Sequence, residues 1–270
     1  MRNRFTRIGL CSISDAEDFH QWNDICCSHR VQTLKRQVLY DEEAYKTYTG
    51  EVLQCNFNEG KDLDDALNMV RKDWYKMAQS YPAPYEGNIV TPQLYASTDG
   101  GYDLFWVGFT PDNNAMGEVT DWFSANASKV FTKWQNIVNC ASWSQWDIFE
   151  VRESKADFEE GDDNYWAFHS CSFKSGKSLS DIRENDETWN EFLDGLGHTG
   201  GVWRWWGAGG SSLEETNDFY VNMGFNSMTE YGNYRDARLQ SLVDGSYPET
   251  IADCQPPRVY SVNNIKAIID

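Results

Sequence analysis

Aromatic side chains alternate with small polar ones along several strand-like stretches, and this combination is typical of a small-molecule pocket. Trp166, Phe168 and Ser170 share one face of a predicted strand, and Trp203 and Trp205 share one face of another. The predicted ligand-binding residues are Gln54, Asn56, Trp106, Trp166, Phe168, Ser170, Trp203, Trp205 and Asn222. The alternative is that these tryptophans fill the interior as packed core, and the sequence leaves both interpretations open.

The other reactive side chains give weaker signals, so no residue is assigned a catalytic role. His169 falls on the helix-facing side of a predicted strand, where a hydrogen-bonded core histidine is expected. His198 lies in the glycine-rich stretch 195–201 and is interpreted as a solvated loop residue. Ligation of a haem or another tetrapyrrole by either histidine is a lower-ranked alternative. Whether the protein is an enzyme stays open.

Two further patterns argue against a phosphate site and a metal site. The glycine-rich stretch 207–210 connects two predicted strands and does not open a helix, so the backbone donors of a phosphate loop are missing. The cysteine spacings match no zinc pattern, since the vicinal Cys26 and Cys27 have no second pair close by. We therefore expect no metal and no cofactor.

One sequence pattern occurs twice and indicates how these residues are positioned. The pattern C-x-F-x-x-G-K-x-L-x-D begins at Cys55 and again at Cys171, 116 positions later. Gly108 and Gly224, each followed by phenylalanine, are separated by the same interval. This repetition predicts an internal duplication, with the same register from the first strand of each copy to the third.

Apolar periodicity predicts the order β-α-β-β-α-β in each copy. The first copy has strands at 51–57, 89–95, 102–109 and 143–151, with helices at 62–77 and 115–138. The second has strands at 165–173, 202–206, 219–225 and 258–265, with helices at 179–196 and 229–243. Pro92 predicts a sheet edge for the strand that contains it. The predicted domains are an N-terminal arm (1–47), a first repeat (48–153), an acidic linker (154–163) and a second repeat (164–270).

This order of elements resembles the ferredoxin-like fold. The predicted fold class is α+β, with two βαββαβ ferredoxin-like repeats forming a pseudo-dimeric α+β barrel. Over residues 48–268 the chain resembles the dimeric α+β barrel superfamily, which includes cofactor-free monooxygenases, isomerases and haem-handling proteins. No functional motif of that superfamily matches this sequence, so no activity is carried over. The alternative is two adjacent ferredoxin-like domains without a shared cavity.

The ferredoxin-like strand order would bring four of the cysteines together in pairs. In that order the end of the first strand lies beside the start of the fourth, which predicts structural disulfides Cys55–Cys140 and Cys171–Cys254. The alternative is four buried thiols. Disulfides would favour a periplasmic or extracellular location.

Composition limits the classes of partner. The 270 residues carry a formal net charge of −19, which argues against binding to nucleic acids or to anionic membrane surfaces. Aromatic residues make up 15% of the chain and supply large side chains for a core or a pocket. We expect a monomer or homodimer that binds a small, partly apolar molecule between its two sheets, with cofactor-independent turnover as an extension. The alternative from another class is a non-catalytic structural or interaction protein with a filled barrel.

Overall fold

The computed structural model describes residues 45–95, 101–155, 164–210 and 216–265. All of them fall within one compact unit, Ala44–Asp270. The predicted N-terminal arm, except residues 45–47, and most of the predicted acidic linker lie outside the described residues.

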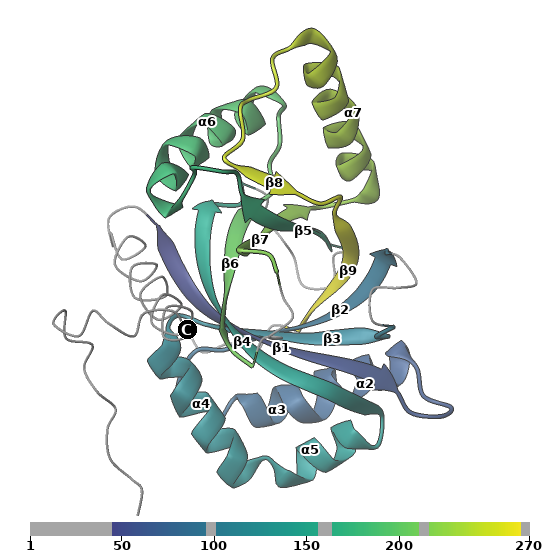
Figure 1. The fold of residues 1–270 in the computed structure, drawn as a ribbon. Helices are drawn as coiled ribbons and strands as arrows, with labels where there is room; N and C mark the ends of the chain where they lie inside the picture. Colours follow the sequence, from purple (N-terminus) through teal and green to yellow (C-terminus); the bar gives the residue numbers. More distant parts are fainter. Residues whose placement is uncertain (1–44, 96–100, 156–163, 211–215, 266–270) are drawn as a thin grey trace, which may run out of the picture. The chain divides into compact units, whose positions relative to one another are not determined.

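The first half of this unit alternates strands with short helices (Figure 1). Its elements are β1 (Lys46–Phe57), α2 (Leu63–Met69), a π-helical turn (Val70–Trp74), α3 (Tyr75–Ala78), β2 (Glu86–Leu94), β3 (Leu104–Thr110), α4 (Asn113–Asn126), α5 (Ser128–Gln135) and β4 (Val138–Arg152). The second half consists of β5 (Asn164–Phe173), a 3₁₀ turn (Leu179–Asp181), α6 (Ile182–Gly195), β6 (Val202–Gly209), β7 (Phe219–Phe225), α7 (Met228–Asp244), β8 (Ala252–Cys254) and β9 (Arg258–Ile265).

Eight antiparallel strands close into one barrel. Their hydrogen-bonded order is β7-β6-β4-β1-β3-β2-β9-β5, and β5 pairs back with β7. β5 pairs with β9 through its first residues and with the short strand β8 through its last ones. The helices lie outside the barrel, with α3, α4 and α5 on one side and α6 and α7 on another (Figure 1). The space enclosed by the eight strands is called the lumen below.

The predicted fold class, two βαββαβ ferredoxin-like repeats forming a pseudo-dimeric α+β barrel, is wrong. That prediction placed the strands in two four-stranded sheets with facing surfaces. Instead, hydrogen bonds between β4 and β6, and between β2 and β9, join the strands of both halves into a single closed sheet. The predicted space between two sheets is therefore the lumen of one barrel.

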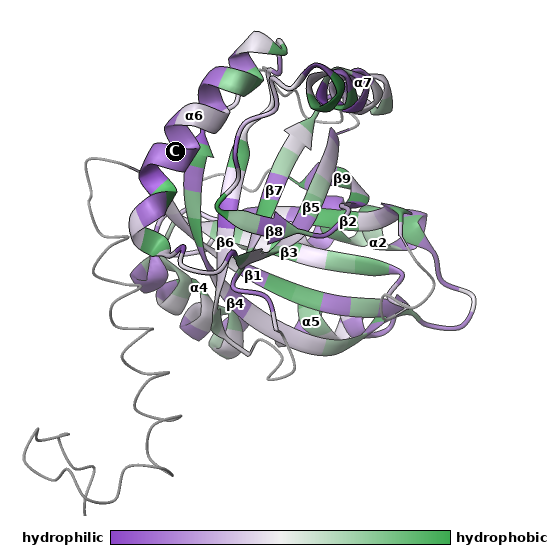
Figure 2. Ribbon diagram, turned by 45° about the horizontal axis from the view of Figure 1, so that its top comes forward, coloured by the Kyte–Doolittle hydropathy of each residue, from purple (hydrophilic) through white to green (hydrophobic). Residues whose placement is uncertain are grey.

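Local sequence signals explain where several helices begin and end. The side chain of Asp62 accepts a hydrogen bond from the backbone N–H of Asp65 and caps α2. Ser227 caps α7 in the same way, and Gly245 follows that helix with a φ of 78°. The helix predicted over 115–138 is divided into α4 and α5 at Ala127. Figure 2 shows apolar residues along β1 and β3, whereas the surface of α6 is largely polar.

The register predicted between the two halves slips by one residue in the third strands. Cys55 pairs with Leu104 across β1 and β3, whereas Cys171 pairs with Phe219 across β5 and β7. The two third strands are therefore related by 115 positions, although the two first strands are related by 116. Successive strand residues point to opposite faces. Because of this slip, the residues of β7 that face inward are the ones that the interval of 116 would have placed outward.

Pro92 does not lie at a sheet edge. Its strand β2 has partners on both sides, β3 and β9. The register with β9 shifts between Pro92 and Leu94, so the missing N–H of proline falls at an irregularity of the ladder.

Both predicted cysteine pairs lie at disulfide distance. Cys55 and Cys140 are paired residues of β1 and β4, and Cys171 and Cys254 are paired residues of β5 and β8. Two such pairs are typical of proteins that fold in oxidising compartments. Among the helices of the described residues, none has both the length and the apolar character that crossing a bilayer requires. The described residues also contain no cluster of three or more His, Cys, Asp or Glu side chains suited to a metal ion.

Candidate functional site

A layer of aromatic rings crosses the middle of the lumen. The ring of Trp205 lies 5.6 Å from that of Phe109 and 5.2 Å from that of Phe168, in edge-to-face contacts. Trp166 completes the layer, 6.0 Å from Phe109 and 6.2 Å from Phe168. These rings, together with buried valine and isoleucine side chains, form a distinct apolar cluster inside the barrel. The aromatic layer separates two cavities, one toward each end.

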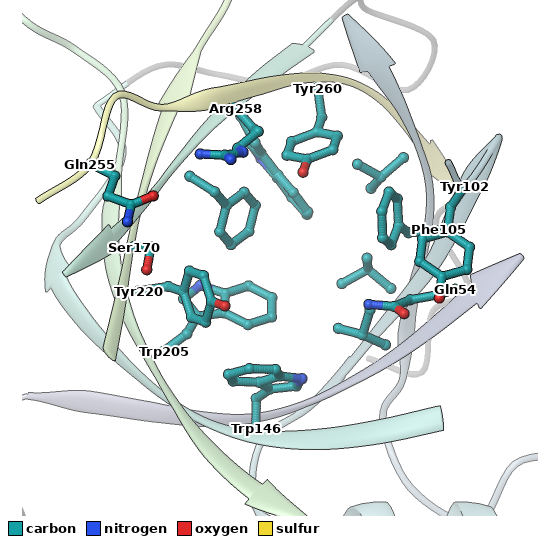
Figure 3. A pocket seen from close by; sticks show the side chains of 15 residues that line it. Gln54, Tyr102, Phe105, Trp146, Ser170, Trp205, Tyr220, Gln255, Arg258 and Tyr260 are labelled. Carbon is teal, nitrogen blue, oxygen red and sulfur yellow. The ribbon is translucent and has the colours of Figure 1, made fainter. Parts of the chain in front are cut away.

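The larger of these, called the wide cavity, has a volume of about 400 Å³. Trp146 and Tyr220 form part of its wall, with ring centroids 5.5 Å apart (Figure 3). Gln54, Ser170 and Arg258 supply polar groups to the same cavity. Among the described residues that line it, only Arg258 carries a formal charge. The wide cavity therefore combines an apolar wall with one cationic group.

Strand alternation positions these polar groups. Gln54 is two residues after Val52 on β1, and both side chains line the wide cavity. The Ser142 hydroxyl donates a 2.9 Å hydrogen bond to Gln54 Oε1, which fixes the orientation of the amide. Figure 3 shows the Gln54 amide nitrogen directed into the cavity. Gln54 can therefore donate a hydrogen bond to a ligand.

The second cavity, called the narrow cavity, has a volume of about 280 Å³ and a different polar lining. Asn88, Asn164 and Asn222 are buried there, and within the described part of the chain their Oδ1 atoms have no hydrogen-bond partner. Two carboxylates, Glu86 and Glu150, line the same cavity. This end of the lumen therefore presents amide and acidic groups and no basic side chain among its described lining residues.

The structure brings seven of the nine predicted ligand-binding residues to the lumen. Gln54, Phe168 and Ser170 line the wide cavity, and Trp203 and Asn222 line the narrow one. The two remaining lumen residues, Trp166 and Trp205, line both cavities. The assignment of these residues to ligand binding stays a prediction.

The other two predicted residues lie elsewhere, and their expected placement is wrong. Trp106 points outward toward the helices, where its indole Nε1 donates to the Tyr85 hydroxyl at 2.8 Å. Asn56 lies near the end of β1, and its Oδ1 accepts a hydrogen bond from the backbone N–H of Asp103. The one-residue slip between β3 and β7 explains the error at Trp106, because Asn222 faces inward whereas Trp106 does not.

The charged residue of the wide cavity was not among the predicted ligand-binding residues. Arg258 and Tyr260 line this cavity, and Val262 and Asn264 line the narrow one. All four lie on β9 at alternate positions, and this alternation was visible in the sequence. The inward face of the last predicted strand could therefore have been recognised.

Neither of the two histidines in the described part of the chain, His169 and His198, lies in the lumen. His169 lines a cavity on the outer side of the sheet, and its Nδ1 lies 3.1 Å from the backbone oxygen of Gln255. Burial lowers the pKa of His169 to about 4, as expected of a core histidine. The predicted solvated position of His198 is wrong, because its side chain is only 1% exposed. It lines none of the cavities described, so this structure does not support the tetrapyrrole alternative at His198.

Comparison with known proteins gives a resemblance in fold. No protein-family model matches the sequence, and no curated protein matches it. The chain resembles the solved structure of an anthrone oxidase-like protein at 12% identity and a TM-score of 0.42, over 82% of this chain and 94% of the other. It also resembles a mutant chlorite dismutase from Candidatus Nitrospira defluvii at 9% identity and a TM-score of 0.43, over 81% of this chain and 92% of that one.

Both resemblances are in fold alone. Identities and TM-scores of this size carry no information about ligand or reaction. The comparisons therefore show no family for this chain.

Proposed function

We propose that the protein binds a small, largely apolar molecule with an acidic group in the wide cavity of its barrel. The observation that carries this proposal is the presence of one arginine, Arg258, in a cavity otherwise lined by aromatic, aliphatic and uncharged polar side chains. A guanidinium group matches the geometry of a carboxylate and binds it through two parallel hydrogen bonds.

The size and the lining of the wide cavity support a ligand of this class. A volume of about 400 Å³ lies within the usual range of small-molecule sites. The apolar part of the ligand would pack on Trp166 and Trp205, and its acidic group would face Arg258. Gln54 would donate a further hydrogen bond through its amide nitrogen. This arrangement requires both an apolar body and an anionic group in the same molecule.

The wide cavity favours binding over turnover. Its described lining contains no Asp, Glu, His or Cys, so the groups able to exchange a proton near neutral pH are limited. The tyrosine hydroxyls of Tyr102, Tyr220 and Tyr260 are the remaining candidates. The proposal is therefore a binding function, with a filled barrel of purely structural role as the alternative.

The test compares two probes of nearly equal shape, 2-naphthoate and the neutral 2-naphthalenemethanol, by calorimetric titration. We expect the wild type to bind naphthoate about ten-fold more tightly or better, a difference of about 1.4 kcal/mol. Arg258→Gln should bring the two affinities together without abolishing binding of the alcohol. Val52→Trp should weaken both probes by filling the cavity, whereas Leu239→Phe on the exposed surface of α7 serves as the control.

Two results would contradict the proposal. Absence of binding of both probes to the folded wild type would favour the filled-barrel alternative. Equal affinities for the acid and the alcohol in the wild type would remove the role given to Arg258.

A further inference from the structure

A fourth cavity, called the outer cavity and distinct from the one beside His169, lies outside the barrel between the sheet and helices α4 and α5. Its volume is about 410 Å³, and eight aromatic side chains line it, among them Trp74, Tyr81 and Trp134. Glu51 is the only charged residue among its described lining residues. This composition is opposite in charge to that of the wide cavity.

Glu51 is buried, with 8% of its surface exposed, and several donors converge on it. The hydroxyl of Tyr85 donates to Oε1, and the indole Nε1 of Trp143 donates to Oε2 at 2.7 Å. Trp106 Nε1 in turn donates to the Tyr85 hydroxyl at 2.8 Å. Every one of these hydrogen bonds is oriented toward the carboxyl group, and such donors stabilise its ionised form.

No cation of the described residues forms an ion pair with Glu51. Burial raises the pKa of Glu51, and the hydrogen bonds from Tyr85 and Trp143 act in the opposite direction. A buried carboxylate without a counter-ion is unfavourable unless it takes up a proton or a positive charge reaches it, and the donors around Glu51 favour the second outcome. Glu51 is therefore a buried acid that receives hydrogen bonds from Tyr85 and Trp143 and has no cationic partner among the described residues.

The fold does not require an acid at this position. Ala167, 116 positions later, occupies the matching place on β5, where it is buried and faces outward as Glu51 does. β5 therefore forms without a carboxylate at this point. A structural role in strand formation does not explain Glu51.

Backbone geometry also accommodates the donor network. Glu51 pairs with Gly108 across β1 and β3. A Cβ atom at Gly108 would collide with the hydroxyl of Tyr85, so only glycine lets the tyrosine reach across β3 to the carboxylate. The position of Tyr85 against Glu51 thus depends on a specific small residue.

The outer cavity has an opening at the surface. Trp143 is 48% exposed and Phe131 is 37% exposed, and both also line the cavity. Large apolar side chains that are exposed at the edge of an apolar cavity suit the entry of an apolar ligand. A molecule that passes between them reaches the carboxylate, because Trp143 donates to it.

We propose that the outer cavity binds a small lipophilic ammonium ion, with Glu51 as its counter-ion and the surrounding aromatic rings as its apolar wall. Aromatic rings attract cations through their negatively charged faces, and a desolvated site strengthens this attraction. The ligand class is a primary or quaternary amine with a compact aromatic or aliphatic body. This site is separate from the lumen and does not depend on the function proposed there.

The experiment titrates the full chain with 2-phenylethylammonium and with its neutral isostere 2-phenylethanol. We expect the wild type to prefer the ammonium ion by ten-fold or more, and Glu51→Gln to remove this preference. Glutamine retains an acceptor for the Tyr85 hydroxyl and a similar volume but carries no charge. Asp121→Asn removes one negative charge from an exposed position on α4 and should leave the preference unchanged.

A second readout follows the wild type itself and does not depend on the Glu51→Gln variant. The indole N–H signals of Trp106 and Trp143, assigned by substitution with phenylalanine, should shift with 2-phenylethylammonium and much less with 2-phenylethanol. Equal affinities of the wild type for the two probes would overturn the proposal. So would indole signals that stay in place, or a Glu51→Gln variant that keeps the preference for the ammonium ion.

Discussion

His198 is a neutral imidazole held among apolar side chains. Its ring lies 5.0 Å from that of Phe225 and 5.8 Å from that of Tyr234. Burial lowers the pKa of His198 to about 4; Arg152 acts in the same direction and Glu230 in the opposite one. Protonation of this residue is therefore coupled to unfolding.

We expect stability to fall between pH 6.5 and pH 4 because the unfolded chain binds a proton at His198 that the folded chain excludes. The contribution is fully present above pH 6.5 and reaches about 3 kcal/mol over this interval. Replacing His198 with phenylalanine should flatten the pH dependence by up to that amount, as measured by urea unfolding at pH 7, 5.5 and 4. His169, whose pKa is also lowered to about 4, adds to this dependence in the same direction.

A curve for the His198→Phe variant that superimposes on that of the wild type would contradict this assignment. Asp194 does not complicate the interval. Hydrogen bonds from Arg152 and Lys155 lower the pKa of Asp194 to about 2, so its contribution is lost only below the range tested.

The features of single residues differ in how far the sequence predicts them. The helix cap at Asp62 was predictable because capping depends on neighbouring residues only. The burial of His198 was not, because Tyr234 packs on it from a distant helix, α7. Glu51 gave a visible but unused signal. It shares an outward face of β1 with Leu53, Cys55 and Phe57, and an acid on an otherwise apolar face marks a special site.

At the scale of elements, a buried ion pair connects β6 to α6. Arg204 Nη1 donates to Asp186 Oδ2 at 2.7 Å, and both side chains are less than 10% exposed. The Tyr45 hydroxyl also donates to Asp186 Oδ2, at 2.8 Å. Burial acts to lower the pKa of Arg204, but Asp186 outweighs this and raises it. The Asp186 carboxylate of α6 is thus bound by Arg204 of β6 and by Tyr45.

Removing only the arginine should be more damaging than removing both charges. Arg204→Met leaves the Asp186 carboxylate buried without its cation, and we expect a loss of about 3–5 kcal/mol in the free energy of unfolding. Arg204→Met combined with Asp186→Leu should recover most of that loss, because no buried charge remains. Urea unfolding of the wild type, both single variants and the double variant measures the coupling. A double variant less stable than Arg204→Met would contradict this account.

Most elements were predictable, and the pairings that join the two halves were not. β7 and β9 begin and end at the predicted residues because each is a short run of alternating side chains between turns. β1 is longer than predicted, beginning at Lys46. The inward face of β7 could not be inferred from the interval of 116. The slip arises in the connections between strands, and their effect on register leaves no local pattern.

At the scale of the whole molecule, the two cysteine pairs close long loops across the barrel. The paired cysteines are separated by 85 and 83 positions. If both pairs are oxidised, each loop closure contributes on the order of 4 kcal/mol in the chain-entropy model. Cys55 follows Gln54 and Cys171 follows Ser170, so both pairs lie at the end of the lumen that contains the wide cavity.

Reduction should therefore lower the melting temperature substantially, by roughly 8 °C or more for each pair. The measurement compares thermal unfolding with and without a phosphine reductant. A variant with serine at Cys55, Cys140, Cys171 and Cys254 serves as the control, and its melting temperature should not respond to the reductant. An unchanged melting temperature of the wild type would count against both disulfides.

Closure of the barrel was beyond prediction from the sequence. The strands of each half carry local signals, but the pairs β4–β6 and β2–β9, which join the two halves, depend on segments far apart in the chain. Residue types were sufficient to identify seven lumen residues among nine. They did not reveal that an aromatic layer would divide the lumen into two cavities of different chemistry.

That layer gives the two cavities of the barrel a common wall. Trp166 and Trp205 form a wall of both cavities, so a ligand that restrains or displaces these rings at one end changes the space available at the other. Any such effect is reciprocal: a factor by which occupancy of the wide cavity changes affinity in the narrow one must also apply in reverse. The indole rings of Trp166 and Trp205 would then couple ligand binding in the two cavities. A change in their fluorescence would report a ligand in either cavity.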